Sequence, residues 1–322
     1  MVSRGYGMKS SPTLSFKNKI ALIIPTRNRP ELLIKLLNTI KLQEVKPDQV
    51  IIVDGSDTPV KPQIEPLAFE GLTCVYVYPP SLTTQRNQGI LHLNREITLA
   101  GYLDDDIELK PDAIKEMLAF WENSPEDMAG AAFNIVNNPP RNPLTKAFTR
   151  FFTITGKIPG KVLSSGFCTV EVPLTKDVES EWLCGGATIW RRSILENYKY
   201  DEWYKGWAYH EDAEFSYRVS KKYRMIVLHK AKVDHNPPQY NKSKSKNLGK
   251  MAVINRYYFV KKNPELSIPL FYWATIGEIF LNSLSSVTDR DRAGIERALG
   301  NLEGLSDIIL GKVHQIDENF RK

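Results

Sequence analysis

The chain has 322 residues, of which 42% are hydrophobic and 25% are charged, and its formal net charge is +6. This balance is typical of a folded protein and excludes a disordered chain and a polytopic membrane protein. Its three cysteines, Cys74, Cys168 and Cys184, form no CxxC pair, so we expect neither a disulfide framework nor structural zinc. Residues 1–19 are polar and lack an apolar core, so we expect no signal peptide and a cytoplasmic location.

Strand and helix signals alternate in the first half of the chain. Short apolar runs predict strands, and apolar residues at helical spacing predict helices. The predicted strands are 20–24, 50–53, 74–78 and 98–103, and the predicted helices between them are 31–42 and 83–94. Strands separated by helices are typical of a doubly wound α/β sheet with helices on both faces.

The second half is less regular. A helix at 112–122 and a strand at 129–136 precede a Pro/Asn-rich stretch, 137–143, which predicts a long loop or a subdomain seam. A basic loop begins at 237, and helices are predicted at 249–262, 270–287 and 290–310. We therefore expect an N-terminal extension (1–19), an α/β domain (20–236) and a C-terminal helical appendage (237–322).

The positive charge is concentrated in one late segment. Residues 237–262 hold six lysines and Arg256 but no acid, which leaves 36 basic and 37 acidic residues elsewhere. A nucleic-acid binder would spread basic residues over a reading face, so we expect no nucleic-acid partner. The segment is either a solvated basic loop or the binding site of a local anionic partner.

Polar residues follow three of the predicted strands, at 25–29, 54–56 and 104–106. In an open α/β sheet, ligands bind outside the carboxyl ends of the strands, so these residues should converge on one crevice. The last group, Asp104-Asp105-Asp106, places three carboxylates side by side, an arrangement that a Mg²⁺ or Mn²⁺ ion would stabilise. The alternative is an acidic turn before the next helix.

A cation held by few protein ligands indicates a substrate that carries phosphate. No glycine-rich phosphate loop follows any predicted strand, so basic side chains must supply the remaining contacts. The candidates are Arg27, Arg29 and Arg86.

Seven short motifs occur in a recognisable order. They are Pro25-Thr26-Arg27-Asn28-Arg29, Asp54-Gly55-Ser56, Gln85-Arg86-Asn87-Gln88-Gly89, Asp104-Asp105-Asp106, Cys184-Gly185-Gly186, His210-Glu211-Asp212 and Val233-Asp234-His235. Each motif alone is a weak signal, but the ordered set resembles family 2 glycosyltransferases of the GT-A fold over about residues 20–262. The resemblance implies that 20–110 is the nucleotide-sugar-binding half and 111–236 the acceptor-binding half of one GT-A domain.

The resemblance implies a role for each matching residue on the donor side. The nucleotide-sugar-binding set is Pro25, Thr26, Arg27, Asp54, Arg86, Asp104, Asp105, Gly185 and Gly186. Within it, Thr26, Arg27 and Asp54 would hold the base and Arg86 would approach the diphosphate. Gly185 and Gly186 would let the backbone approach the donor sugar, although a simple turn is the alternative.

The metal and the acceptor complete the implied site. Asp104 and Asp106 would hold Mn²⁺ or Mg²⁺, and His235 would complete the shell or contact phosphate, unless it is structural. Asp212 would be the catalytic base and Glu211 would orient the acceptor, the alternative being two acids that favour a helix N-terminus. The nearby aromatic residues suit either a sugar face or a core. They are Trp203, Tyr204, Trp207 and Tyr209.

The sequence therefore predicts an inverting, metal-dependent glycosyltransferase. The expected donor is a nucleotide-diphospho-sugar, first a UDP-sugar, and the expected acceptor is a glycan or lipid-linked glycan in cell-surface polysaccharide or glycolipid assembly. Two alternatives stay open. One is an Asp-x-Asp phosphotransferase or phosphatase of the haloacid-dehalogenase kind, and the other is a catalytically silent carbohydrate-binding protein on the same fold.

The segment 268–287 carries one charge, Glu278, on a polar stripe. Its length would permit a crossing, but its amphipathic pattern favours a helix in the plane of a membrane surface. Together with the lysines of 242–262 it predicts a peripheral anchor on the anionic inner face of the cell membrane. The alternative is that its apolar side packs on the catalytic domain.

Overall fold

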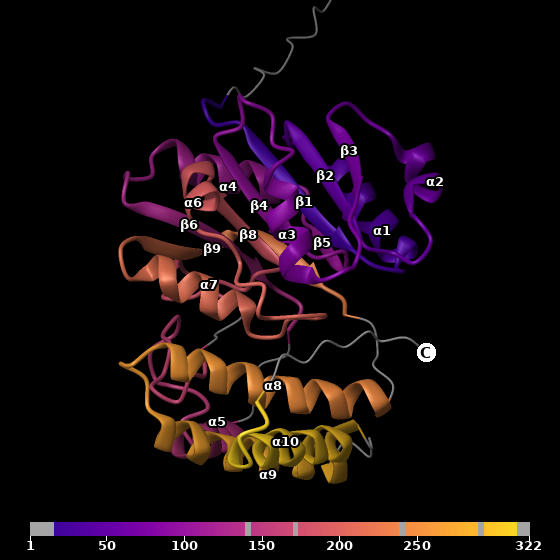
Figure 1. Cartoon of the computed structure of the whole chain (residues 1–322). Coiled ribbons are helices and arrows are strands. Elements are labelled where there is room, and N and C mark those ends of the chain that lie inside the picture. The colour runs from indigo at the N-terminus through magenta and orange to yellow at the C-terminus, as the bar shows by residue number, and fades with distance from the viewer. Residues whose placement is uncertain (1–15, 139–142, 170–172, 238–241, 289–292, 314–322) are drawn as a thin grey trace, which may run out of the picture.

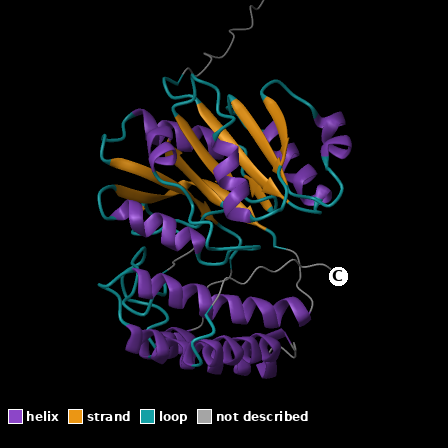
Figure 2. Ribbon diagram, in the orientation of Figure 1, coloured by secondary structure: helices purple, strands orange, loops and turns teal. Residues whose placement is uncertain are grey.

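The computed structural model describes residues 16–138, 143–169, 173–237, 242–288 and 293–313 (Figures 1 and 2). The strands are β1 (Ile20–Thr26), β2 (Gln49–Asp54), β3 (Leu72–Tyr76), β4 (Leu99–Leu103), β5 (Ile107–Leu109), β6 (Met128–Ile135), β7 (Val178–Glu179), β8 (Ala187–Arg191) and β9 (Arg224–His235). The helices are α1 (Pro30–Lys41), α2 (Lys61–Ile64), η1 (Glu65–Leu67), α3 (Leu82–Ile90), α4 (Ala113–Glu122), α5 (Pro143–Phe151), α6 (Arg192–Asn197), α7 (Glu211–Ser220), α8 (Lys242–Lys262), α9 (Ile268–Thr288) and α10 (Ala293–Ile309).

The predicted α/β class and the C-terminal helices are confirmed. Across the described ranges the strands form a nine-stranded mixed sheet of order β3-β2-β1-β4-β8-β6-β9-β5, with β7 paired to β9. Strands β3, β2, β1 and β4 are parallel neighbours, whereas β8 is antiparallel to both β4 and β6. The regular half therefore follows the alternating sequence pattern, and the antiparallel pairings involve the strands of the irregular half, β7, β8 and β9.

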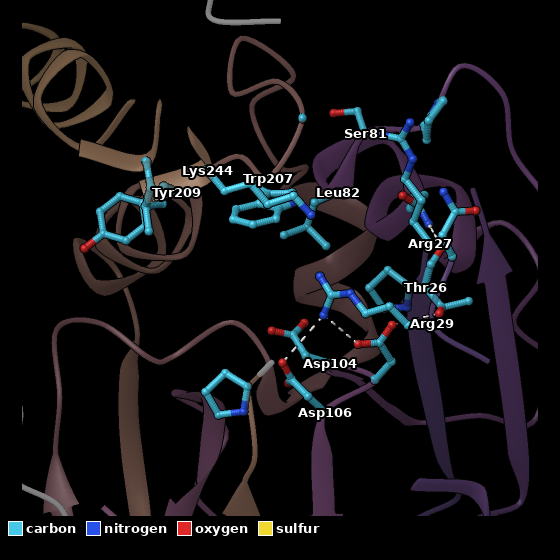
Figure 3. A pocket seen from close by; sticks show the side chains of 18 of the residues that line it. Thr26, Arg27, Arg29, Ser81, Leu82, Asp104, Asp106, Trp207, Tyr209 and Lys244 are labelled. Carbon is cyan, nitrogen blue, oxygen red and sulfur yellow. Dashed lines mark hydrogen bonds and ion pairs between the residues drawn. The ribbon is translucent and has the colours of Figure 1, made fainter. Parts of the chain in front are cut away.

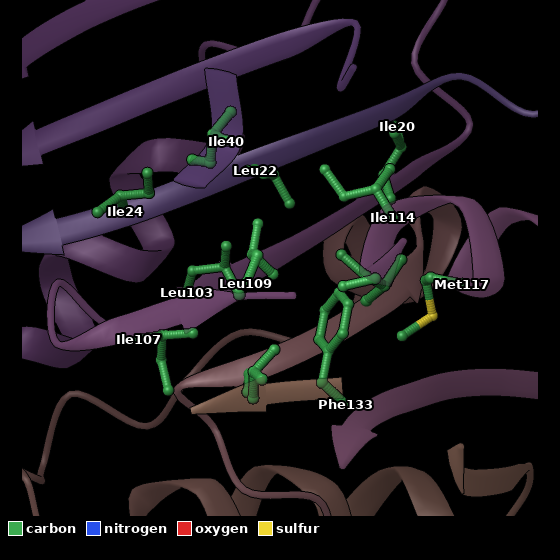
Figure 4. Packing of buried hydrophobic residues seen from close by; sticks show 14 of the residues in the cluster. Ile20, Leu22, Ile24, Ile40, Leu103, Ile107, Leu109, Ile114, Met117 and Phe133 are labelled. Carbon is green, nitrogen blue, oxygen red and sulfur yellow. The ribbon is translucent and has the colours of Figure 1, made fainter. Parts of the chain in front are cut away.

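Two hydrophobic clusters cover the two faces of the sheet, and β1 contributes to both. Ile20, Leu22 and Ile24 pack into the cluster that contains α1 and α4 (Figure 4). Ala21 and Ile23 pack into the other, with residues of α6 and α7. Because side chains alternate along a strand, a run that is apolar at every position must be covered on both sides.

The three aspartates make up the whole link between β4 and β5. Strand β4 pairs with β1 and β8, but β5, only three residues later, pairs with β9 at the far edge of the sheet order. The sheet must curl for both pairings to form. Because Ile107 lies opposite His235, the link brings Asp106 beside that histidine.

Helix α8 lies between the sheet domain and the layer formed by α9 and α10 (Figure 1). On the domain side, Asn255 Nδ2 donates to the backbone oxygen of Tyr209 at 2.7 Å. On the other side, α8 and α10 approach through glycines: a Cβ at Gly300 would lie 1.8 Å from the backbone oxygen of Lys246. The appendage therefore packs tightly onto the domain through α8.

The basic segment finds acidic partners within the chain. Lys250 pairs with Glu303 and Asp307 of α10, each at 2.8 Å. Lys262 pairs with Asp201 and Glu214, each at 2.7 Å. The segment is helical from Lys242, seven residues before the predicted start, so the predicted basic loop is wrong there, and much of its charge binds α10 and the sheet domain.

Several elements differ from the sequence predictions. Helix α3 ends at Ile90, four residues earlier than predicted, and β3 ends at Tyr76. The short elements α2, β5 and α5 were not predicted. The predicted loop at 137–143 lies partly outside the described residues, and α5 begins at its last residue, Pro143. Of the helices that the structure describes, none has the length and apolarity needed to cross a membrane.

We expect Gly300→Ala to destabilise the protein, although alanine is the better helix former by about 1 kcal/mol. The added Cβ would collide with backbone of α8, and such overpacking costs about 1–3 kcal/mol. Urea unfolding measures the change, with Ser306→Ala, at an exposed position of the same helix, as the control. A Gly300→Ala protein as stable as the control would contradict this packing.

Candidate active site

A pocket of about 540 Å³ opens at the carboxyl ends of β1 and β4 (Figure 3). Its walls come from the loop after β1, the start of α3, the Asp104–Asp106 link, the loop before α7, the end of β9 and the first turns of α8. The lining residues are Pro25, Thr26, Arg27, Asn28, Arg29, Pro80, Ser81, Leu82, Gln85, Asp104, Asp105, Asp106, Gly206, Trp207, Tyr209, His235, Pro237, Lys244 and Leu248. Two of the three predicted strand ends, and His235, therefore meet in one crevice.

Asp105, the centre of the triplet, is bonded to the last residue of β1 and to the loop that follows it. Thr26 Oγ1 donates to Asp105 Oδ2 at 2.8 Å, and Arg29 Nη1 lies 3.1 Å from Oδ1. Burial raises the pKa of Asp105 to about 7, against the lowering effects of Arg29 and Thr26. Its oxygens are thus engaged by protein groups, which leaves Asp104 and Asp106 as the carboxylates available to a ligand.

Asp106 is the best candidate metal ligand. Its side chain is 7% exposed, and its Oδ1 is buried without a hydrogen-bond partner among the described residues. His235 Nε2 lies 3.3 Å from that oxygen, and the Asp106 carboxylate raises the pKa of the imidazole. An oxygen and a nitrogen that face each other in this way fit a divalent cation.

The described residues alone do not supply a full coordination shell. Within the described ranges, no group of three or more His, Cys, Asp or Glu side chains is placed to hold a metal ion. A cation at Asp106 and His235 would therefore need further ligands from a substrate, as is usual for Mg²⁺ bound by one or two carboxylates.

Arg86 is buried and joins the two acidic motifs. Its side chain is 1% exposed, with Nη2 at 3.0 Å from Asp104 Oδ1 and Nη1 at 2.7 Å from Glu211 Oε1. The rings of Tyr102 and Tyr200 lie 5.6 and 5.0 Å from the guanidinium carbon. The structure thus places Arg86 behind the pocket wall, where it pairs with two carboxylates.

Gly185 and Gly186 pass between the acidic side chains. A Cβ at Gly186 would lie 2.1 Å from Asp104 Oδ2, and one at Gly185 would lie 2.8 Å from both Arg86 Nη1 and Asp212 Cβ. The backbone nitrogen of Gly185 donates to Asp212 Oδ2 at 3.1 Å. These close approaches require glycine.

The Glu211-Asp212 pair opens α7 beside the pocket but outside its lining. Glu211 is buried and Asp212 is half-buried, so Asp212 is the more accessible carboxylate. Burial raises the pKa of Glu211 to about 7, with Asp212 adding to the effect, and burial also raises the pKa of Asp212. A raised pKa makes a carboxylate a stronger base.

Asp54 lies apart from the pocket. It is 1% exposed, and its two oxygens accept hydrogen bonds from the backbone nitrogens of Ser56 (2.9 Å) and Val60 (2.7 Å). This arrangement fixes the turn after β2. The pocket wall near this turn is made instead by Arg27, whose guanidinium lies 3.7 Å from Asp57.

The predicted aromatic cluster divides between the core and the pocket. Trp203 stacks on Tyr258 of α8 with ring centroids 3.8 Å apart, and Tyr204 is fully buried. Trp207 and Tyr209 line the pocket, and Lys244 Nζ lies 5.8 Å from the Trp207 ring.

Several pocket residues were given no role in the site from the sequence. Gln85 Nε2 donates to the backbone oxygens of Thr26 and Val53 and so ties α3 to the ends of β1 and β2. Lys244 and Leu248 come from α8, more than 130 residues after the aspartate triplet. Two features of the sequence could have pointed to these residues. The polar Gln-Arg-Asn run contains Gln85, and the basic segment contains Lys244.

Comparisons with known proteins agree with this geometry. The sequence profile described as glycosyl transferase family 2 matches residues 21–198, more than half of the chain. The match ends before Glu211, Asp212 and His235. A search of curated proteins by sequence finds no match.

Two solved structures share the fold at 14% sequence identity. A mannosyltransferase from Pyrobaculum calidifontis, solved with GDP-Man and Mn²⁺, has a TM-score of 0.53, and the alignment covers 96% of this chain and 82% of that one. GalNAc-T7, solved with UDP, GalNAc and Mn²⁺, has a TM-score of 0.55, and the alignment covers 81% of this chain and 54% of that one. At this identity the likeness establishes the fold, and the predicted GT-A architecture is confirmed.

We expect Arg86→Met to lower the free energy of unfolding by about 3–5 kcal/mol, because it leaves two carboxylates without their buried cation. Arg95→Met, at an exposed arginine, is the matched control and should stay within about 0.5 kcal/mol of the parent. Urea unfolding measures both. If Arg86→Met lowers the free energy of unfolding by less than about 1 kcal/mol, the Arg86 ion pairs contribute no more than exposed surface pairs do.

Proposed function

The chain belongs to glycosyl transferase family 2, and from this premise we propose that it transfers a sugar, with inversion, from a nucleotide-diphosphate donor to a hydroxyl acceptor. One observation carries the proposal. Asp106, a buried carboxylate whose Oδ1 lies 3.3 Å from His235 Nε2, lines a pocket that also contains Arg27, Arg29 and Lys244. A cation beside basic side chains is the arrangement that a diphosphate requires.

The donor would lie along the carboxyl ends of the strands. We place its base against Pro25, Thr26 and Arg27, while Asp54 shapes the adjoining turn. Arg86 would act on the donor indirectly, by holding Asp104. A UDP-sugar is our first candidate, and GDP-sugars are the comparison to test.

Asp106 and His235 would hold Mn²⁺ or Mg²⁺, with Asp104 beside them. When bound, the ion would neutralise the diphosphate and so favour its departure. Arg29 lies 3.6 Å from Asp106 Oδ2 and limits the charge repulsion within the triplet.

The acceptor hydroxyl would be deprotonated by Asp212. The oxygen of the acceptor hydroxyl would form the new bond to the anomeric carbon of the donor sugar as the bond from that carbon to the diphosphate breaks. The hydroxyl proton would pass to the Asp212 carboxylate. Hydrogen bonds from Gly185 and Ala213 hold Asp212 in place. Glu211, bonded to Arg86, would position the pair and the acceptor.

The proposed setting is cell-surface polysaccharide or glycolipid assembly, with a glycan or lipid-linked glycan as acceptor. The family match supports sugar transfer over the phosphotransferase alternative. Product analysis separates the two reactions, since sugar transfer releases a nucleoside diphosphate and phosphotransfer releases inorganic phosphate.

We expect donor binding to require the cation. Titration calorimetry with UDP-sugars and GDP-sugars should give measurable affinity with Mn²⁺ and a loss of more than about tenfold in EDTA or in Asp106→Ala, because the diphosphate charge is left uncompensated. Glu126→Ala, at an exposed acid, should bind as the parent does. Equal affinity under all these conditions would refute binding through a metal bridge.

We expect Asp212→Asn to keep the donor affinity and to lower turnover by roughly 10²- to 10⁴-fold, the range for a general base. Glu211→Gln is the matched variant, and its main effect should be on stability because Glu211 binds Arg86. Steady-state release of nucleoside diphosphate in the presence of acceptor measures turnover. An active Asp212→Asn enzyme together with an inactive, folded Glu211→Gln enzyme would assign the base to Glu211.

A further inference from the structure

The outward faces of α9 and α10 are apolar. The exposed side chains described on α9 are Pro269, Trp273, Ile276, Phe280 and Leu284. Those on α10 and directly after it are Ile295, Leu299, Leu302, Ser306, Ile309 and Leu310. Nearly all follow spacings of three or four residues, so each set forms one stripe along its helix. Only Ser306 among these side chains is polar.

The polar residues of α9 face inward. Thr275 is fully buried and accepts a hydrogen bond from Arg256 of α8, which also pairs with Glu278 at 2.7 Å. Asn282 Nδ2 donates to Asn301 Oδ1 of α10 at 2.7 Å. The apolar side predicted from the sequence is therefore the side that faces away from the rest of the chain.

Helix α5 extends this apolar surface. Phe151 is 66% exposed, and its ring meets Trp273 edge to face with centroids 5.3 Å apart. Trp273 also stacks on Phe152, and its indole nitrogen donates to the backbone oxygen of Phe151 at 2.9 Å. Figure 1 shows α5 beside α9 and α10, on the side of α8 away from the sheet.

The exposed charged residues that the structure describes on α5, α9 and α10 and directly after α10 are basic. Lys146 and Arg150 on α5 and Lys312 after α10 are exposed, and residues 143–169 contain no acid. The acids of α9 and α10 are half-buried, and three of them, Glu278, Glu303 and Asp307, pair with cations of α8.

We propose that α5, α9 and α10 form a surface that lies on an anionic lipid bilayer. The apolar stripes would enter the boundary between headgroups and acyl chains, and the exposed cations would contact lipid phosphates. Tryptophan suits this boundary, which is apolar on one side and wet on the other. The cations come from α5 and from the residues after α10, whereas three of the α8 lysines predicted from the sequence for this role, Lys246, Lys250 and Lys262, pair with acids of the chain.

Charge complementarity favours lipid over a second copy of the chain. A dimer formed through this face would bring Lys146, Arg150 and Lys312 of both copies to one interface, and the acids that the structure describes on α9 and α10 are half-buried, three of them paired with cations of α8. A contiguous apolar face of this kind is unusual on a monomer that has no partner. The inference rests on the proposed function in one respect: a surface that binds a bilayer would bring the enzyme to a lipid-linked acceptor.

Vesicle co-sedimentation of the full chain tests the apolar part. We expect binding to phosphatidylcholine/phosphatidylglycerol vesicles at low salt, and less binding to phosphatidylcholine alone or at high salt. Phe280→Glu with Leu302→Glu should reduce binding more than about tenfold. Leu42→Glu with Leu91→Glu, at leucines that are 74% and 68% exposed elsewhere, should not.

Neutralising variants test the basic part. Lys146→Gln with Arg150→Gln should weaken binding to anionic vesicles by about 30-fold, whereas Lys35→Gln with Lys41→Gln, on exposed lysines of α1, should leave it unchanged. No pelleting of the parent with anionic vesicles, or equal losses in variants and controls, would overturn the proposal. So would light scattering that shows a dimer which Phe280→Glu converts to a monomer.

Donor binding separates this inference from the proposed function. The Phe280→Glu/Leu302→Glu protein should keep the parent's affinity for the nucleotide sugar while it loses vesicle binding. A parent that binds anionic vesicles but transfers no sugar would leave the lipid surface standing and overturn the proposed function alone.

Discussion

The candidate site depends on the ion pairs that the buried Arg86 guanidinium forms with two carboxylates. One nitrogen binds Asp104, which follows β4, and another binds Glu211, which opens α7 more than 100 residues later. A buried arginine is tolerated only when carboxylates compensate its charge, and the carboxylates in turn need the arginine. The donor side and the proposed acceptor side are therefore held at a fixed separation by a single side chain.

The curl of the sheet has a similar effect on the cation site. Because only three residues join β4 to β5, the aspartate triplet has little freedom, and pairing of β5 with β9 holds His235 beside it. Asp105 is bonded to Thr26 at the end of β1 and to Arg29 after it, which fixes the centre of the triplet. The protein thus holds the Asp106 carboxylate and the His235 imidazole side by side before any ligand arrives, which is the preorganisation that binding requires.

Local patterns in the sequence predicted the parts of the structure that local forces determine. Continuous apolar runs specified β1, β2 and β4, and the polar residues at the ends of β1 and β4, but not of β2, marked the pocket edge. Contacts between distant segments could not be read in this way. No local signal indicates that the Thr26 hydroxyl would donate a hydrogen bond to Asp105. Nor does one indicate that the Asp54 oxygens would accept hydrogen bonds from the backbone of the next turn. Helix α5 was missed because it is short and its neighbour Trp273 lies 122 residues away.

The inward polar side chains of α9, Thr275, Glu278 and Asn282, tie the C-terminal helices to one another. Removing α9 and α10 would strip Arg256, which is 1% exposed, of its carboxylate, and would expose the backbone of α8 that Gly300 now covers. The first turns of α8 also form a wall of the pocket. The appendage is therefore no detachable tail. Recombination that exchanged α9 and α10 for other helices would have to preserve α8 and supply new acidic partners for it, so the pocket and the appendage are expected to be inherited together.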